Sequence, residues 1–132
     1  MKSQWIGRIR RHTTRSLSGS LAEQQALEYL EAAGLTTVCR NFRCRLGEID
    51  LIMRDGEYLV FVEVRYRSGS GFVSAAQSVD RRKQRKIARS ARLFMSRQPA
   101  LCDLPARFDV VAIERAAGVP LRIQWLRDAF RV

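Results

Sequence analysis

The stretch from Gly47 to Arg67, GEIDLIMRDGEYLVFVEVRYR, holds the residues whose types and spacing best fit catalytic chemistry. Most of its side chains are apolar, but three carboxylates and one guanidinium interrupt them: Glu48, Asp50, Glu63 and Arg65. Carboxylates within apolar strands are costly to bury unless they are paired or bind a metal. Clustered carboxylate oxygens are ligands that suit Mg²⁺. We therefore expect a metal-dependent site that acts on a phosphate group.

The pattern of this stretch predicts a tight β-hairpin with strands at about 48–54 and 57–67. Asp55-Gly56, which lies between them, is a strong two-residue turn signal. With this turn, Arg54 would face Glu57 across the hairpin.

Side chains alternate between the two faces of a strand, so one face of the hairpin would be wholly apolar and pack on a helix. That face holds Ile49, Leu51, Met53, Val60, Val62 and Val64. The other face would hold the charged residues, with Glu48 directly opposite Glu63 and Asp50 opposite Phe61. Facing Cβ atoms lie about 4.5–5.5 Å apart, and like charges there destabilise a sheet. A bound divalent cation would relieve that repulsion.

Two other interpretations of the hairpin remain open. The acids could be solvated on a surface hairpin and balanced by Arg54, Arg65 and Arg67. Alternatively, two carboxylates could act as an acid/base pair, as in glycosidases. The second alternative fits the strongly basic composition poorly, because a neutral sugar does not need a basic protein.

The composition indicates a polyanionic partner. The 132 residues carry a formal net charge of +11, and the isoelectric point is about 10.9. An imbalance of this size most often serves nucleic acid. A basic domain without such a partner is the alternative. A membrane partner is less well supported, because no basic amphipathic anchor and no apolar run of spanning length occurs.

The cysteines and the single histidine do not form a zinc motif. Cys39, Cys44 and Cys102 show no Cys-x-x-Cys spacing, and His12 lies in a polar N-terminal stretch. A structural zinc site needs four ligands. We expect reduced, half-buried cysteines. Since the N-terminus has no apolar signal-peptide core, we expect a cytoplasmic protein.

Two helices are predicted around the hairpin. The first runs from Ser18 or Ser20 to about Ala33, with apolar residues at helical spacing and Gly34 as its stop. Its Glu23, in the first turn, could simply complement the helix dipole. The second spans about 75–98 and carries a face of one charge sign. We expect this face to contact phosphates through Arg81, Arg82, Lys83, Arg85, Lys86 and Arg89.

The remaining elements complete an α/β fold. An extended segment precedes the hairpin at Leu35 to Arg45, and strands are expected at Arg107 to Glu114 and Leu121 to Leu126. We expect residues 1–17 to be a flexible basic tail and 18–132 to be a single domain. This order predicts a central mixed sheet flanked by helices.

Asp50 followed by Glu63-Val64-Arg65 resembles the PD-(D/E)XK nuclease motif. More closely, the chain resembles the YraN-like family of small uncharacterised proteins, and the resemblance covers nearly everything after residue 18. The matching segments are GSLAEQQALEYL, NFR, GEIDLIMRDG, VFVEVRYR, the basic helix after Val79, RFDVVAI and WLRDAF.

That family is similar to archaeal Holliday junction resolvases, which implies a restriction-endonuclease-like fold and a nuclease of structured or branched DNA. The resemblance implies that Asp50, Glu63 and Glu23 bind Mg²⁺ or Mn²⁺ and that Glu48 supports them. Such enzymes are often homodimers. The motif lysine is Arg65 here, which can orient a phosphate but cannot act as a general base, because it stays protonated. In the resembled family a glycine often comes just before the acid of the first helix, and here Ala22 occupies that position before Glu23.

Three functional hypotheses follow. The first is a metal-dependent endonuclease. The second, motivated by Arg65, is a non-catalytic nucleic-acid-binding module with a nuclease-like fold. The third is an interaction or ribosome-associated domain whose charge serves RNA or acidic partners.

Overall fold

The computed structural model describes residues 14–68, 79–115, 118 and 120–132. The described elements are the helices α2 (Thr14–Ala32) and α3 (Arg81–Ser96) and the strands β1 (Thr36–Cys44), β2 (Gly47–Asp55), β3 (Tyr58–Ser68), β4 (Ala106–Arg115) and β5 (Arg122–Phe130). The strands form one sheet in the order β1-β2-β3-β4-β5. Strands β3 and β4 are parallel and the other neighbours are antiparallel. This mixed sheet with its two helices confirms the predicted α/β fold.

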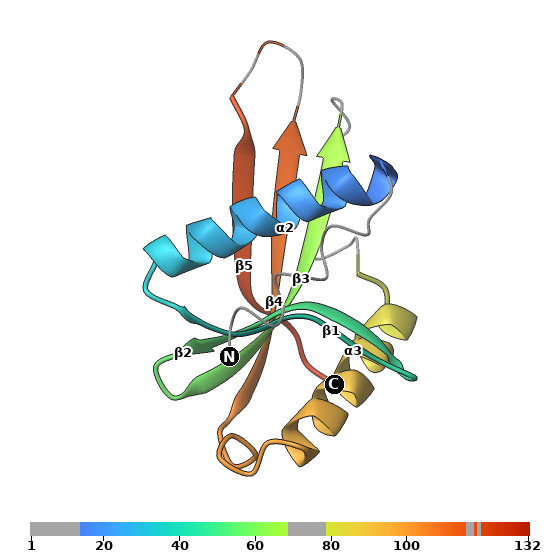
Figure 1. The fold of residues 1–132 in the computed structure, drawn as a ribbon, viewed down its shortest axis with the longest axis vertical. Coiled ribbons are helices and arrows are strands. Elements are labelled where there is room, and N and C mark those ends of the chain that lie inside the picture. The colour runs from blue at the N-terminus through green and yellow to red at the C-terminus, as the bar shows by residue number, and fades with distance from the viewer. Residues whose placement is uncertain (1–13, 69–78, 116–117, 119) are drawn as a thin grey trace.

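Each helix packs on its own layer of apolar side chains. In Figure 1, α2 crosses the sheet over β3, β4 and β5, while α3 lies beside the β1–β2 hairpin. The α2 layer contains Ala22, Ala26, Leu27, Leu30, Leu51, Met53, Val60, Val62, Val111 and Ile113. The α3 layer contains Cys39, Phe42, Ile49, Ile52, Leu59, Phe61, Ile87, Ala91, Phe94 and Val110. The central strands β2, β3 and β4 are therefore buried on both faces, whereas no residue of the edge strand β5 is fully buried.

The first helix begins earlier than the sequence predicts. Because α2 starts at Thr14, Ser18 and Ser20 lie inside it and do not cap it. Residues 14–17 of the expected tail belong to this helix, and residues 1–13 lie outside the described part of the chain. The end is close to the prediction, since Gly34 adopts a φ of 104° and the Leu35 N–H donates to the Leu30 carbonyl at 3.1 Å.

The second helix is shorter than predicted. It begins after Asp80, whose carboxylate accepts the Lys83 N–H at 2.8 Å. Ile87, Ala91 and Phe94 are buried, as its apolar spacing predicts. Residues 75–78 of the predicted span lie outside the described residues. None of the helices in the described part of the chain is both long and apolar enough to cross a membrane.

The predicted hairpin register is wrong by two residues. Asp55 pairs with Tyr58, so the turn consists of Gly56 and Glu57. Gly56 has a φ of 60° and occupies the first central position, where a type II′ turn requires glycine. The prediction assumed glycine in the second position. The corrected register keeps Leu51, Met53, Val60 and Val62 on one face, as predicted, because a shift of two residues preserves the alternation.

A buried ion-pair network joins β4 to β5 and to the hairpin turn. Asp109 is fully buried, and its carboxylate accepts hydrogen bonds from Arg107, from Trp125 Nε1 at 2.9 Å and from the Asp128 N–H at 2.9 Å. Arg107 also donates to Asp55 at 2.9 Å. The predicted end of the last strand at Leu126 is wrong, because the Asp128 contact lies within β5, which reaches Phe130.

We predict that Asp109→Ala lowers the free energy of unfolding by about 3 kcal/mol or more, because it leaves Arg107 and Trp125 without their buried acceptor. Urea unfolding followed by circular dichroism measures the change. Glu114→Ala is the matched control, since it removes an acid whose partner, Arg122, is exposed, and should cost less than about 1 kcal/mol. Equal losses for the two variants would contradict this account.

Candidate active site

The site lies where β2 separates from β3. The pairing of these strands ends at Leu51 and Val62, one residue before Asp50. Beyond that point the Val64 N–H donates to Oδ2 of Asp50 at 2.8 Å. A side-chain carboxylate thus takes the place of a strand carbonyl. This exchange fixes Asp50 at the point of separation and satisfies a backbone donor.

The alternation of faces also breaks at this point. Leu51 packs in the α2 layer, whereas Ile49, two residues earlier, packs in the α3 layer. The prediction that Ile49 shares a face with Leu51 is therefore wrong. On the neighbouring strand, Asn41 is buried and has a φ of 52°. A non-glycine residue with positive φ marks a local irregularity of the kind that often occurs at functional sites.

Three acids from three elements converge here. Burial raises the pKa of Asp50 well above its usual range, and the charges of Glu63 and Glu23 raise it further. Burial also raises the pKa of Glu23, although hydrogen bonds with Asn41 and Asp50 oppose the shift. The sequence predicts this trio, and the structure brings it together from α2, β2 and β3.

Glu63 is the acid of the trio that forms ion pairs with basic side chains. Glu63 is only 6% exposed. Burial raises the pKa of its carboxyl group, whereas the charges of Lys83 and Arg65 lower that pKa. Nε of Arg65 lies 3.5 Å from Oε2, and Nζ of Lys83 lies 3.6 Å from the same oxygen. Arg65 follows two residues later on the same strand, whereas Lys83 comes from α3. The sequence assigns Lys83 only to a phosphate-binding face.

Glu48 does not lie where the sequence predicts. The corrected register removes it from the position opposite Glu63, and it pairs across the other side of β2 with Arg43. Its side chain is exposed and enters a pocket of about 410 Å³. It influences the acid trio only through its charge, which raises the pKa values of Asp50 and Glu23. Glu48 is therefore a neighbour of the cluster.

Arg40 and Asn41 are parts of the site to which the sequence analysis gives no role. Arg40 is only 7% exposed, and its Nε and Nη2 have no hydrogen-bond partner among the described residues. Its charge lowers the pKa of Glu23. The only signal in the sequence is the segment Asn41-Phe42-Arg43, which matches the resembled family but has no chemical pattern of its own.

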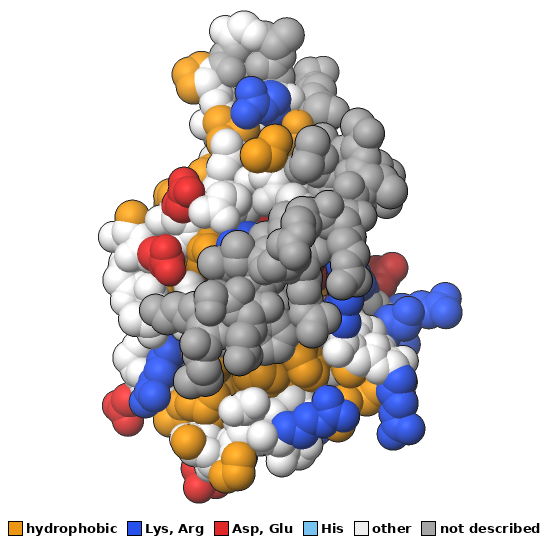
Figure 2. Space-filling model, viewed as in Figure 1, with side chains coloured by type: hydrophobic (Ala, Val, Ile, Leu, Met, Phe, Trp, Pro, Cys, Tyr) orange, Lys and Arg blue, Asp and Glu red, His pale blue; other side chains and the backbone are white. Residues whose placement is uncertain are grey.

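The predicted phosphate-binding face surrounds the start of α3. Figure 2 shows Lys and Arg side chains on the side of the molecule where α3 lies in Figure 1. Five of the six predicted residues are exposed, and Lys83 is half-buried against Glu63. The exposed five are Arg81, Arg82, Arg85, Lys86 and Arg89. Basic side chains thus lie next to the acid trio.

The acid trio fits a divalent cation by its chemistry. Asp50 has hydrogen-bonding interactions with both Glu23 and Glu63, and a hydrogen bond between two carboxyl groups needs a proton. In this arrangement, no three His, Cys, Asp or Glu side chains of the described residues are already placed to hold a metal ion. Carboxylate oxygens suit Mg²⁺ and Mn²⁺, and binding of a metal releases protons from its ligands.

We predict that Asp50→Asn stabilises the metal-free protein at high pH. The folded-state pKa of Asp50 is raised, so its contribution to stability is complete below the usual carboxyl range near pH 4 and is lost as pH rises through the raised pKa. Asparagine keeps an oxygen for the Val64 N–H and carries no charge. Urea unfolding in EDTA should show a gain of about 1–3 kcal/mol at pH 8 and little change at pH 4. A gain that is equal at both pH values would contradict the assignment.

Comparison with known proteins identifies the family. The profile of the uncharacterised protein family UPF0102 matches residues 22–113. A UPF0102 protein of Pseudomonas putida strain GB-1 is 50% identical over 115 residues, which cover 86% of this chain and 92% of the relative. UPF0102 proteins of Xanthomonas campestris pv. campestris strain B100 and Xylella fastidiosa strain M12 are each 51% identical, covering 89% and 86% of this chain and 94% and 92% of the relatives. The chain therefore belongs to the uncharacterised protein family UPF0102, the YraN-like family that its motifs resemble.

Proposed function

We propose that this protein is a metal-dependent endonuclease that acts on structured or branched DNA in the cytoplasm. The observation that carries the proposal is the convergence of Glu23, Asp50 and Glu63, with pKa values raised by burial, beside a strongly basic helix. A purely structural role does not require three acids with raised pKa values at one place, where Glu63 is buried and Glu23 and Asp50 are half-buried. Cys39, Cys44 and Cys102 are thiols, which agrees with a reducing compartment.

Glu23, Asp50 and Glu63 would hold Mg²⁺ or Mn²⁺. When bound, such an ion lowers the pKa of water and neutralises charge on a phosphate. The other roles belong to the chain itself. Arg65, whose guanidinium lies beside Glu63, orients the phosphate group. Five exposed cations of α3 bind the nucleic-acid backbone without distinguishing its sequence: Arg81, Arg82, Arg85, Lys86 and Arg89.

The second candidate is a non-catalytic module that binds nucleic acid through the same surface. Arg65 favours it, because an arginine cannot remove a proton from water at the position of the motif lysine. Both candidates predict binding that weakens steeply with salt. Only the first predicts cleavage.

We predict that the purified protein cleaves DNA with Mg²⁺ or Mn²⁺ and that Asp50→Ala and Glu63→Ala each lower the rate by at least about 100-fold, because each removes a proposed metal ligand. The substrates are a four-way junction, single-stranded DNA and plasmid DNA. Glu57→Ala is the control, since it removes an exposed acid from the turn of the same hairpin and should cleave at the native rate.

Two outcomes would contradict the endonuclease. The first is that native protein binds DNA in EDTA, with steep salt dependence, but cleaves no substrate with either metal. That result would favour the binding module. The second is cleavage by Asp50→Ala and Glu63→Ala at the native rate, which would indicate a contaminating nuclease or a different site.

A further inference from the structure

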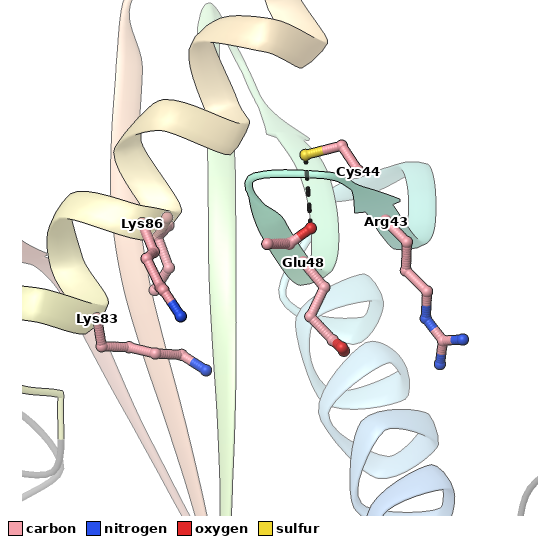
Figure 3. A pocket seen from close by; sticks show the side chains of 7 residues that line it. Arg43, Cys44, Glu48, Lys83 and Lys86 are labelled. Atoms are coloured by element: carbon pink, nitrogen blue, oxygen red, sulfur yellow. Dashed lines mark hydrogen bonds between the residues drawn. The ribbon is translucent and has the colours of Figure 1, made fainter.

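The pocket that Glu48 enters has three cations and one acid among its seven lining residues. It measures about 410 Å³ and is bounded by Arg43, Cys44, Gly47, Glu48, Lys83, Lys86 and Ile87. Figure 3 shows Lys83 and Lys86 on α3 facing the β1–β2 turn, with the Glu48 side chain between them and Arg43. A concave site lined by charges of one sign concentrates ions of the opposite sign. The lining therefore favours an anion.

The shape of the pocket is fixed by close contact between the turn and α3. Gly47 has a φ of 148°, and a Cβ atom there would lie 3.3 Å from Oγ of Ser90. The Cys44 thiol donates to the Gly47 carbonyl at 3.4 Å, and its sulfur lies 3.6 Å from the same Ser90 oxygen. A glycine is thus needed where the turn meets the helix. Because the β1–β2 turn and α3 are already in contact, binding of a ligand costs little conformational entropy in their backbones.

Lys83 connects the pocket to the acid trio. It lines the pocket and also lies 3.6 Å from Glu63. A phosphate that contacts Lys83 from within the pocket is therefore a neighbour of a group held by the acids. Lys83 thus lies between the pocket and the acid trio. Two consecutive phosphates of one strand, which are separated by a single nucleoside, could occupy these two positions.

The charges of the lining match a phosphodiester. Three cations line the pocket. Glu63 neutralises the charge of Lys83 by its ion pair, and the negative charge of Glu48 offsets a second positive charge. About one positive charge is left, which suits the single negative charge of a backbone phosphate better than the double charge of a terminal one near pH 7. Arg43 offers a planar fork of donors for such an oxygen pair.

We propose that this pocket is a phosphate subsite that holds the phosphodiester next to the one at the acid trio, within a single nucleic-acid strand. The proposal rests on the proposed function, since it places both groups on one substrate. It divides the basic residues of α3 into two classes. Lys83 and Lys86 hold one defined phosphate, and the backbone is contacted at variable positions by Arg81, Arg82, Arg85 and Arg89.

The test is nuclear magnetic resonance titration of the full chain in EDTA at low salt. The probe is thymidylyl-thymidine, which carries one phosphodiester, and its comparison is the same dinucleotide with a neutral methylphosphonate linkage. The phosphodiester should shift the amide resonances of Gly47, Lys86 and Ile87, and the neutral analogue should not. Arg43→Gln and Lys86→Gln should each weaken binding about tenfold, the effect of losing one charge-assisted hydrogen bond.

Arg92→Gln is the matched control, because it removes an exposed cation of the same helix outside the pocket. It should weaken binding less than about twofold. Equal binding of the neutral analogue, shifts confined to other residues, or equal weakening by Arg92→Gln would overturn the subsite. The titration contains no metal, so a failure to cleave DNA with the subsite intact would count against the endonuclease alone.

Discussion

The hydrogen bond from the Val64 N–H to the Asp50 carboxylate is the interaction on which the site depends. It occurs where the pairing of β2 with β3 has stopped at Leu51 and Val62. If β2 continued its regular pairing with β3, the Val64 N–H would bond to a backbone carbonyl and would not be available to the Asp50 carboxylate. The two strands would then leave no space between them for side chains. The separation opens the sheet to side chains from α2 on one face and α3 on the other. Glu23 and Lys83 reach the same centre from these two helices.

The electrostatics of this centre oppose folding more than they favour it. Burial raises the pKa values of all three acids, and the charges of Glu63 and Glu23 raise that of Asp50 further, so the folded chain disfavours their charged forms. Arg40 adds a buried guanidinium with two donors that lack partners in the described part of the chain. Elsewhere the chain satisfies its buried charge, as at Asp109, which accepts from Arg107, Trp125 and the Asp128 N–H. Unfavourable electrostatic interactions that are confined to one part of a protein are typical of functional sites.

Much of this arrangement is predictable from the sequence. Apolar spacing finds both helices and the buried strands. The family resemblance groups Glu23, Asp50 and Glu63, which no local pattern could do, and the three side chains lie close enough to interact. Their role as metal ligands stays a prediction. One error arises at the turn. An Asp-Gly pair fits a type I′ turn, but here glycine comes first in the turn because Asp55 is needed by Arg107. A tertiary ion pair thus sets the register, and with it the place of Glu48.

The break in alternation at Asn41 and Ile49 is likewise invisible to a pattern that assumes regular strands. The position of Lys83 depends on where α3 packs, which its own sequence does not specify. These are long-range consequences of packing. They explain why the acids of the site are easier to predict than its cations.

We propose that Asp50 and Glu63 are ligands of one divalent cation. Anomalous scattering of manganese, in crystals of the native chain soaked in MnCl₂, would locate such an ion. We expect one strong peak within about 2–2.3 Å of carboxylate oxygens from both residues, with Glu23 beside it. A map with no peak at this position, or with manganese only at exposed acids such as Glu57, would contradict it.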